Sequence, residues 1–184
     1  MTMNAANISF TGGKNLGGTA GLIHWAYAED VLTWPATLNI DFDAAESFGA
    51  LVTVPIDDPF VFKPGKGFLT LDCTLEEGEV THKQLGTAES YGFENGYDNN
   101  FAGNDPAYLG FSAFGANKKF VVIAEELNGK RRVIGFPNYP ARIEANDGTS
   151  GKKVSDGRKN TLSFKCRGAV PPPIYLAPIP VPSS

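Results

Sequence analysis

The stretch FVVIAEELNGKRRVI, residues 120–134, decides the fold class of this chain. Its first five residues are apolar and mostly β-branched or aromatic, which favours a β-strand, and an apolar pair returns at Val133 and Ile134. Between them lies Asn128-Gly129, the preferred pair for a type I′ turn, because both central residues of that turn need a positive φ. The stretch therefore predicts an antiparallel hairpin that turns at these two residues.

The rest of the chain fits a mainly β protein. Its 184 residues suffice for one domain, and 21 Gly and 13 Pro interrupt long helices and favour short strands joined by turns. We expect residues 87–103 to form an extended strand or a long exposed loop, since they show no clear period. Further strand candidates are residues 22–31, 47–56, 60–62, 68–75, 79–85, 142–145 and 161–167.

One short helix is expected, over residues 106–116. Asp105 suits the N-cap position, Pro106 suits the first turn, and Gly115 is a plausible C-cap. Together with the strands, this predicts a β-sandwich or barrel with one short helix.

The two ends of the chain differ from its middle in composition. We expect a flexible, Gly-rich arm over residues 1–20, a single β domain over residues 21–168, and an extended, proline-rich tail over residues 169–184. The tail is expected to run as polyproline II, outside any sheet interior, and either to hang free or to lie along a neighbouring copy. Residues of the tail that would make such assembly contacts are Pro171, Pro172, Pro173, Ile174, Tyr175 and Leu176.

Charge is unevenly distributed along the sequence. Residues 1–80 hold eleven acids and three bases, a net charge of −8, and residues 81–184 carry the remaining +4. If the two halves show opposite faces, copies could stack head to tail; if the halves fold together, the charges intermix. Among the basic clusters, Lys130, Arg131 and Arg132 are candidates for such an assembly contact.

No pattern for catalysis or metal binding is visible. His24 and His82 lack the motifs of a catalytic base, and neither they nor the two cysteines have a paired ligand spacing for zinc. Cys73 and Cys166 each fall on the apolar side of an alternating run, so we expect buried, reduced thiols, which could pair only if their strands meet. We therefore expect no enzyme activity and no cofactor.

A long pattern in the second half resembles a group of small bacteriophage virion structural proteins, chiefly tail-tube-like proteins. It comprises the hairpin ending in Val133-Ile134-Gly135, a Pro140-Ala141 step, a small-residue loop over 148–153, and the closing Thr161-Leu162-Ser163-Phe164. The resemblance implies a β-sandwich or barrel with a flanking helix, whose subunits pair their sheets side by side into a ring. It also implies a noncatalytic tail-tube subunit, made in the host cytoplasm and located in the virion, with other copies and other virion proteins as partners.

A tube of this kind passes phage DNA without binding it specifically, and an acidic lumen would keep the DNA from sticking. The candidate lining residues are Asp41, Asp43, Asp57, Asp58, Asp72, Glu76 and Glu77.

A capsid decoration or head–tail connector protein is the alternative within the same class. A more remote alternative is a carbohydrate-binding β-sandwich module or a glycoside-processing enzyme. Its exposed aromatic residues would be Trp25, Trp34, Tyr91, Phe93 and Tyr97. No run reaches the roughly 18 apolar residues that a membrane span requires.

Overall fold

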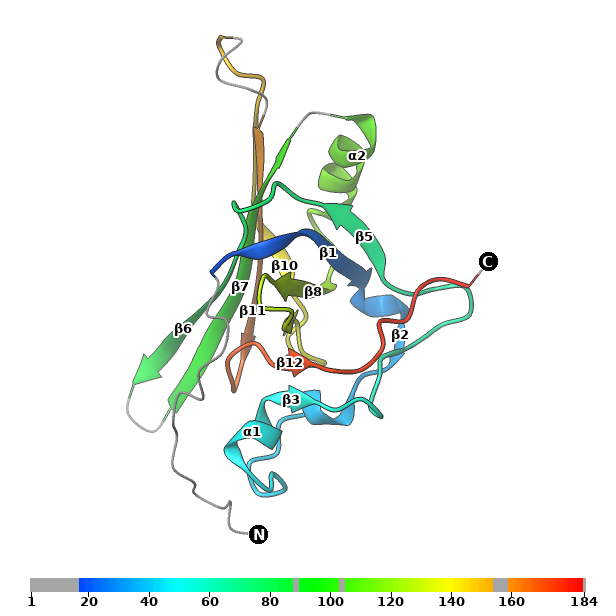
Figure 1. The fold of residues 1–184 in the computed structure, drawn as a ribbon, viewed down its shortest axis with the longest axis vertical. Helices are drawn as coiled ribbons and strands as arrows, with labels where there is room; N and C mark the ends of the chain where they lie inside the picture. The colour runs from blue at the N-terminus through cyan, green and yellow to red at the C-terminus, as the bar shows by residue number, and fades with distance from the viewer. Residues whose placement is uncertain (1–16, 88–89, 103–104, 154–158, 184) are drawn as a thin grey trace.

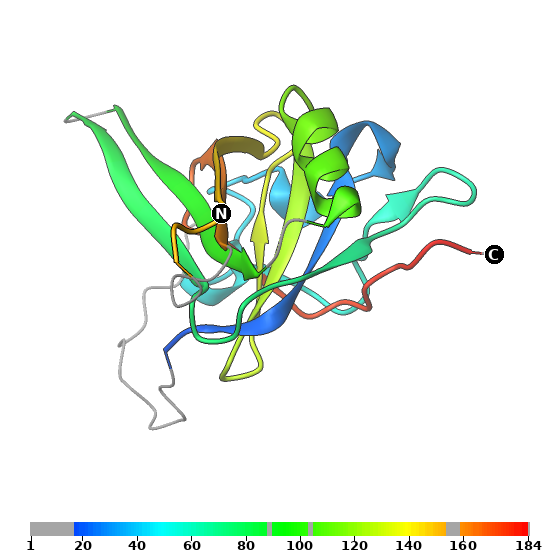
Figure 2. The same cartoon turned by 90° about the horizontal axis from the view of Figure 1, so that it is seen from above.

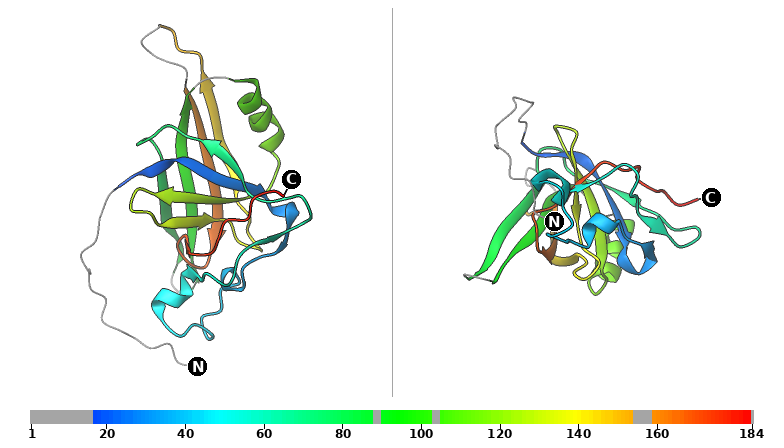
Figure 3. Two further views of the ribbon diagram at one scale, coloured as in Figure 1. Left: turned by 45° about the vertical axis from the view of Figure 1, so that its right-hand side comes forward. Right: turned by 90° about the horizontal axis from the view of Figure 1, so that it is seen from below.

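Two β-sheets with crossing strands form the body of the protein. The computed structural model describes residues 17–87, 90–102, 105–153 and 159–183. The fold is mainly β and sandwich-like, with one helix of more than two turns, as the sequence predicted. Figures 1 and 3 show the strands of one sheet running across those of the other.

The larger sheet has six strands in the order β3-β12-β9-β8-β1-β5. They are β1 (Thr19–Tyr27), β3 (Thr53–Val54), β5 (Leu69–Asp72), β8 (Phe120–Glu126), β9 (Arg131–Ile134) and β12 (Ile174–Tyr175). The smaller sheet has the order β10-β11-β7-β6, and all its neighbouring strands are antiparallel. They are β6 (Glu79–Thr87), β7 (Ser90–Ala102), β10 (Arg142–Thr149) and β11 (Lys159–Gly168). The remaining elements are η1 (Ala28–Asp30), β2 (Val31–Thr33), η2 (Ala36–Leu38), α1 (Phe48–Leu51), β4 (Val61–Phe62) and α2 (Pro106–Gly115), with β2 and β4 forming a two-stranded sheet.

The core lies between the two sheets and continues beyond the larger one. The first five residues of β8 are fully buried, and because side chains alternate along a strand, both faces of β8 are covered. On one face the Phe120 ring packs 5.4 Å from the ring of Phe164 in β11. A second aromatic cluster surrounds Phe60, whose ring lies 5.4 Å from Trp34 and 5.2 Å from Phe68.

The predicted hairpin is formed by β8 and β9, but its turn is of another type. Gly129 N donates to Glu126 O at 2.8 Å, and of the two predicted turn residues only Gly129 has a positive φ, of 84°. The loop therefore has three residues, 127–129, with the glycine in the left-handed region at its end. Asn128 holds this form through its side chain, which accepts from Lys130 N and donates to Glu126 Oε2, each at 2.8 Å.

The helix α2 is confirmed within a residue of its expected range. Asp105 stands at the N-cap position, although its side chain makes no capping hydrogen bond, and Gly115 is the last helical residue. The strand expected over residues 47–56 is wrong in its first half, where the short helix α1 forms. Ser47 caps this helix by accepting from Ala50 N at 3.2 Å, and the chain becomes extended only at the β-branched pair of β3.

Within the segment 87–103, residues 90–102 form an extended strand rather than a loop, and residues 88, 89 and 103 lie outside the described residues. This strand is β7, which pairs with β6 along the whole of that strand and with β11 on its other side. The hairpin of β6 and β7 projects from the body of the molecule, as the view from above shows (Figure 2).

The expectation that the tail stays outside any sheet is wrong. Residues 174–175 form β12, which lies between β3 and β9 inside the six-stranded sheet. Proline has no N–H but keeps its carbonyl acceptor, so Pro173 O accepts from Val133 N at 2.9 Å, while Ile174 N donates to Val52 O at 2.8 Å. Tyr175 is completely buried. The tail therefore belongs to the domain that was expected to end at residue 168.

The N-terminal arm expected over residues 1–20 lies mostly outside the described residues. Within the described part, β1 begins at Thr19, whose side chain is buried, so the ordered domain starts earlier than residue 21. No helix among the described residues is long and apolar enough to cross a membrane.

Candidate assembly surfaces

The outer face of the four-stranded sheet is polar along its whole width. The register of β7 with β11 and β6 places Tyr97, Phe164 and Val80 on the core side, so their direct sequence neighbours point outward. We call the outward set the polar face. Its residues are Glu79, Thr81, Lys83, Glu94, Gly96, Asp98, Asn100, Arg142, Asp147, Thr161, Ser163, Lys165 and Arg167. Leu85 of β6, opposite Gly92, is the one large apolar residue on this side among the described residues of the four strands. The rest of this face is polar or small and is built for contact with water.

Both edges of the four-stranded sheet are open strands. Among the described residues, the nine-residue β6 pairs only with β7, and the eight-residue β10 pairs only with β11. Because each of the three strand pairs between these edges is antiparallel, β6 and β10 run in opposite directions. Long open edges carry unpaired N–H and C=O groups and are ready to pair with another chain.

The helix α2 flanks the β10 edge and has no charged residue. Asn146 of β10 hydrogen-bonds Ser112 of α2 through both the hydroxyl and the carbonyl oxygen of the serine. Leu109 and Phe114 of α2 are 49% and 61% exposed. An uncharged helix with large exposed apolar side chains marks a surface that favours a protein partner.

The predicted basic cluster is largely used within the molecule. Arg131 Nη1 donates to Ala177 O at 3.3 Å and its guanidinium lies 6.0 Å from the Tyr175 ring centre. Arg132 Nε lies 3.4 Å from Glu126 Oε1 as an ion pair. Lys130 alone of the three is exposed. The cluster therefore stabilises the tail and the hairpin of its own molecule, and of its three charges only that of Lys130 is exposed.

The predicted tail contacts are also mostly internal. Pro172 and Pro173 are buried, and Pro171 and Ile174 are half-buried against their own chain. Of the six tail residues proposed for assembly, only Leu176 is well exposed, at 51%.

The predicted acidic lining is not gathered on one surface. Its first two residues lie between η2 and α1, the next two follow β3, and the last three lie in or just after β5. Strands β3 and β5 are opposite edges of the six-stranded sheet. Some of these carboxylates serve the fold: Asp58 Oδ2 accepts from the N–H and the hydroxyl of Thr37, both at 3.2 Å, and Glu77 pairs with Lys159 at 3.4 Å. The first four residues are Asp41, Asp43, Asp57 and Asp58, and the last three are Asp72, Glu76 and Glu77.

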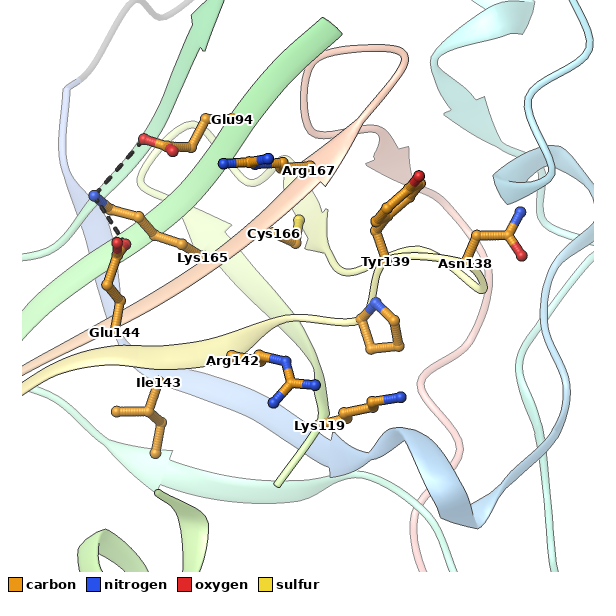
Figure 4. Close-up of a pocket in the computed structure, with 11 residues that line it drawn as sticks. Glu94, Lys119, Asn138, Tyr139, Arg142, Ile143, Glu144, Lys165, Cys166 and Arg167 are labelled. Atoms are coloured by element: carbon orange, nitrogen blue, oxygen red, sulfur yellow. Dashed lines mark ion pairs between the residues drawn. The ribbon is translucent and has the colours of Figure 1, made fainter. Parts of the chain in front are cut away.

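A groove of about 430 Å³ opens on the polar face where β7, β10 and β11 meet the segment 138–140 (Figure 4). We call it the basic groove. At one end Lys165 Nζ lies 3.1 Å from Glu144 and 3.8 Å from Glu94, so its charge is balanced. At the other end Lys119 and Arg142 lie next to one another with no acid close enough for an ion pair among the described residues (Figure 4).

Comparisons of the chain with protein-family models, curated proteins and solved structures gave no match. The surfaces of the protein are therefore the guide to its function.

The cysteines are free thiols, as expected, and no disulfide joins them; Cys166 is buried as predicted, whereas Cys73 is only half-buried. Burial raises the pKa of Cys73 to about 11 and that of Cys166 to about 12, so both thiols are protonated and unreactive near neutral pH. Burial also lowers the pKa of His24, which favours its neutral form. Within the described part of the chain, no three His, Cys, Asp or Glu side chains come together as a possible metal site.

The aromatic residues of the carbohydrate-binding alternative are not brought together as an exposed platform. Tyr97 is fully buried and Trp25 is 8% exposed, and both belong to the core. Trp34 and Phe93 are half-buried, and only Tyr91 is widely exposed, near the tip of the projecting hairpin.

Sequence reasoning missed the polar face and the basic groove for different reasons. The polar face has a local signal, since polar residues alternate with apolar ones in 161–167. The basic groove has none, because Lys119, Arg142 and Arg167 come from segments that meet only in the folded protein.

Proposed function

We propose that this chain is a noncatalytic structural protein of a phage virion and forms the subunit of a tail tube. The observation that carries the proposal is the pair of open edges, β6 and β10, which run in opposite directions on one amphipathic sheet. Copies related by rotation in a ring keep the same orientation, so β6 of one copy meets β10 of the next in antiparallel pairing. Closing the ring removes both open edges of the four-stranded sheet, which a free subunit cannot do.

In such a ring the four-stranded sheets form a continuous barrel with the polar face inside. This face replaces the predicted acidic lining as the candidate lumen. It carries acids such as Glu79 and Asp98 together with bases. Its Lys165 is paired with two glutamates, and a base held between acids neutralises few phosphates, so DNA would pass this part of the face with little binding. Arg142 and Arg167, at one end of the face, have no acid partner among the described residues.

The same arrangement would cover the helix α2. Because α2 flanks β10 at Asn146, an arriving β6–β7 hairpin would come to lie beside the helix. The exposed Leu109 and Phe114 would then lose contact with water at the junction of two subunits.

The first test is electron microscopy of the purified chain over a range of concentrations, with its mass measured in parallel. We expect rings or tubes of uniform diameter. A strict monomer at the highest concentration would contradict the proposal, and single rings that never stack would favour a head–tail connector.

Two matched proline variants test the edge itself, Lys83→Pro and Gln84→Pro. Adjacent residues of β6 point their N–H groups in opposite directions, so one proline removes a donor that serves β7 and the other removes a donor from the open edge. The open-edge variant is the one whose lost N–H group faced away from β7. We expect it to keep the circular dichroism spectrum of the folded chain and to lose ring formation. A folded open-edge variant that still assembles would rule out β6 as the joining strand.

A further inference from the structure

The basic groove holds three cations that the molecule does not neutralise. Lys119, Arg142 and Arg167 are exposed, and none of them forms an ion pair within the part of the chain that the structure describes. Like charges in one groove repel each other, so an anionic partner is stabilised there. The rim also presents Tyr139, which is 60% exposed.

A second hollow, of mixed polarity, continues from the basic groove. The two depressions share Lys119 and Pro140, and the second one has a volume of about 530 Å³. Trp34 and Pro137 form its apolar side, and Asn117 and the ion pair of Lys118 with Glu29 also line it. The groove and the hollow together would fit a segment that has carboxylates beside an aromatic side chain.

The same chain displays a segment of that kind. Residues 41–46, which we call the acidic loop, read Asp-Phe-Asp-Ala-Ala-Glu. Asp41 Oδ1 accepts from Asp43 N at 2.9 Å and from Ala44 N at 3.2 Å, so the loop has a defined turn. Phe42 is 53% exposed, and within the described structure neither Asp43 nor Glu46 forms an ion pair.

We propose that the acidic loop of one copy docks in the basic groove of a second copy. Its carboxylates would lie against Arg142, Arg167 and Lys119, and Phe42 would enter the hollow beside Trp34. No residue of the acidic loop lines the groove of its own molecule, so both surfaces are open at once. Groove and loop are different patches, and their contact is therefore head to tail and can be repeated from copy to copy. The inference rests on the proposed function, because it adds a second contact between subunits that already pair through their edges.

A labelled peptide of residues 39–49 tests the groove without requiring assembly. We expect it to bind the full chain in a fluorescence anisotropy titration, and to bind about tenfold more weakly to Arg142→Glu or Arg167→Glu. Lys130→Glu is the matched control, since it reverses an exposed cation outside the groove and should leave binding unchanged. A peptide with Phe42→Ala should also bind more weakly. Equal binding to all three protein variants, or no binding to the wild type, would overturn the inference.

Charge exchange in the full chain tests the same contact between whole subunits. Arg142→Glu and Asp43→Arg should each weaken self-association, measured by sedimentation, and the double variant should restore it because the opposite charges are exchanged. If both single variants lose self-association and the double variant does not recover it, these residues do not pair.

If the peptide binds but the wild type forms no rings, the tail-tube proposal fails while the groove contact stands. If rings form and the peptide does not bind, the reverse holds.

Discussion

Tyr175 shows most clearly that the proline-rich tail is part of the folded core. Its side chain is completely buried, its ring lies 5.6 Å from that of Phe60, and its hydroxyl donates to Pro178 O at 2.9 Å. A residue in a proline-rich terminal segment thus completes the second aromatic cluster of the core.

We expect Tyr175→Ala to lower the free energy of unfolding by about 3–5 kcal/mol, the usual cost of removing a large aromatic side chain from a core. Tyr175→Phe keeps the ring and removes only the hydroxyl, so it should cost about 1 kcal/mol. Urea denaturation measures both. A loss below about 1 kcal/mol for the alanine variant would show that the tail is not part of the core.

The raised pKa values of the two thiols predict how the stability of the fold changes with pH. In the folded chain the pKa values of Cys73 and Cys166 are raised from 9.0 to about 11 and about 12 by burial. Above pH 9 the unfolded chain loses these protons while the folded chain keeps them, so the free energy of unfolding falls as the pH rises from 9 towards 11 or 12.

Urea denaturation under reducing conditions, repeated from about pH 8 to about pH 11, should show this decrease in the wild type. Cys166→Ala lacks the more strongly shifted thiol, so its stability should fall less steeply over the same range. Parallel curves for the two proteins would show that the Cys166 thiol does not stay protonated in the fold.

At the scale of elements, β12 joins parts of the chain that have no other connection within the sheet. It pairs in parallel with β3 and antiparallel with β9, and Leu176 N extends the contact by donating to Val54 O at 3.0 Å. Without β12 the edge of β9 and the whole of β3 would lose their partners.

We therefore expect a chain that stops after Gly168 to lose its cooperative unfolding transition in circular dichroism. A chain that stops after Val181 is the control, because it keeps the bond from Phe68 N to Pro180 O and lacks only the last three residues. A cooperative transition in the shorter chain would mean that β12 is dispensable.

At the scale of the whole molecule, the two halves of opposite charge are interleaved. β1 from the acidic half lies between β5 and β8, and ion pairs such as Lys118–Glu29, at 2.9 Å, and Lys159–Glu77 link the halves. The halves therefore do not form two opposite faces, and any charge contact between copies must come from smaller patches such as the basic groove.

The ion pairs of the described residues are at least partly exposed, so salt should affect assembly more than folding. Between about 50 mM and about 500 mM NaCl, the free energy of unfolding measured in urea should change by less than about 1 kcal/mol, because exposed pairs contribute little and are screened. Binding of the acidic-loop peptide should weaken over the same range. A large loss of stability with salt would show that electrostatic contacts hold the monomer together.

The sequence by itself determined the features that depend on neighbouring residues. The apolar runs of β8 and β9 predicted their pairing, Asp105-Pro106 predicted the start of α2, and the alternation around Cys166 predicted a buried thiol. These signals are local because strand and helix periods, capping residues and turn residues act within a few positions.

Other features depend on contacts between distant segments. Three prolines predicted a tail outside the sheets, yet Pro173 O accepts from Val133 N of β9. The N–H groups of Ile174 and Leu176 donate to the carbonyls of Val52 and Val54, just before and within β3, which no local pattern reveals. The turn residues Asn128 and Gly129 fitted two loop types, and side-chain hydrogen bonds selected between them. The open edges, the polar face and the basic groove depend on contacts between residues far apart in the chain. Such contacts form only when burial of the core brings those segments together.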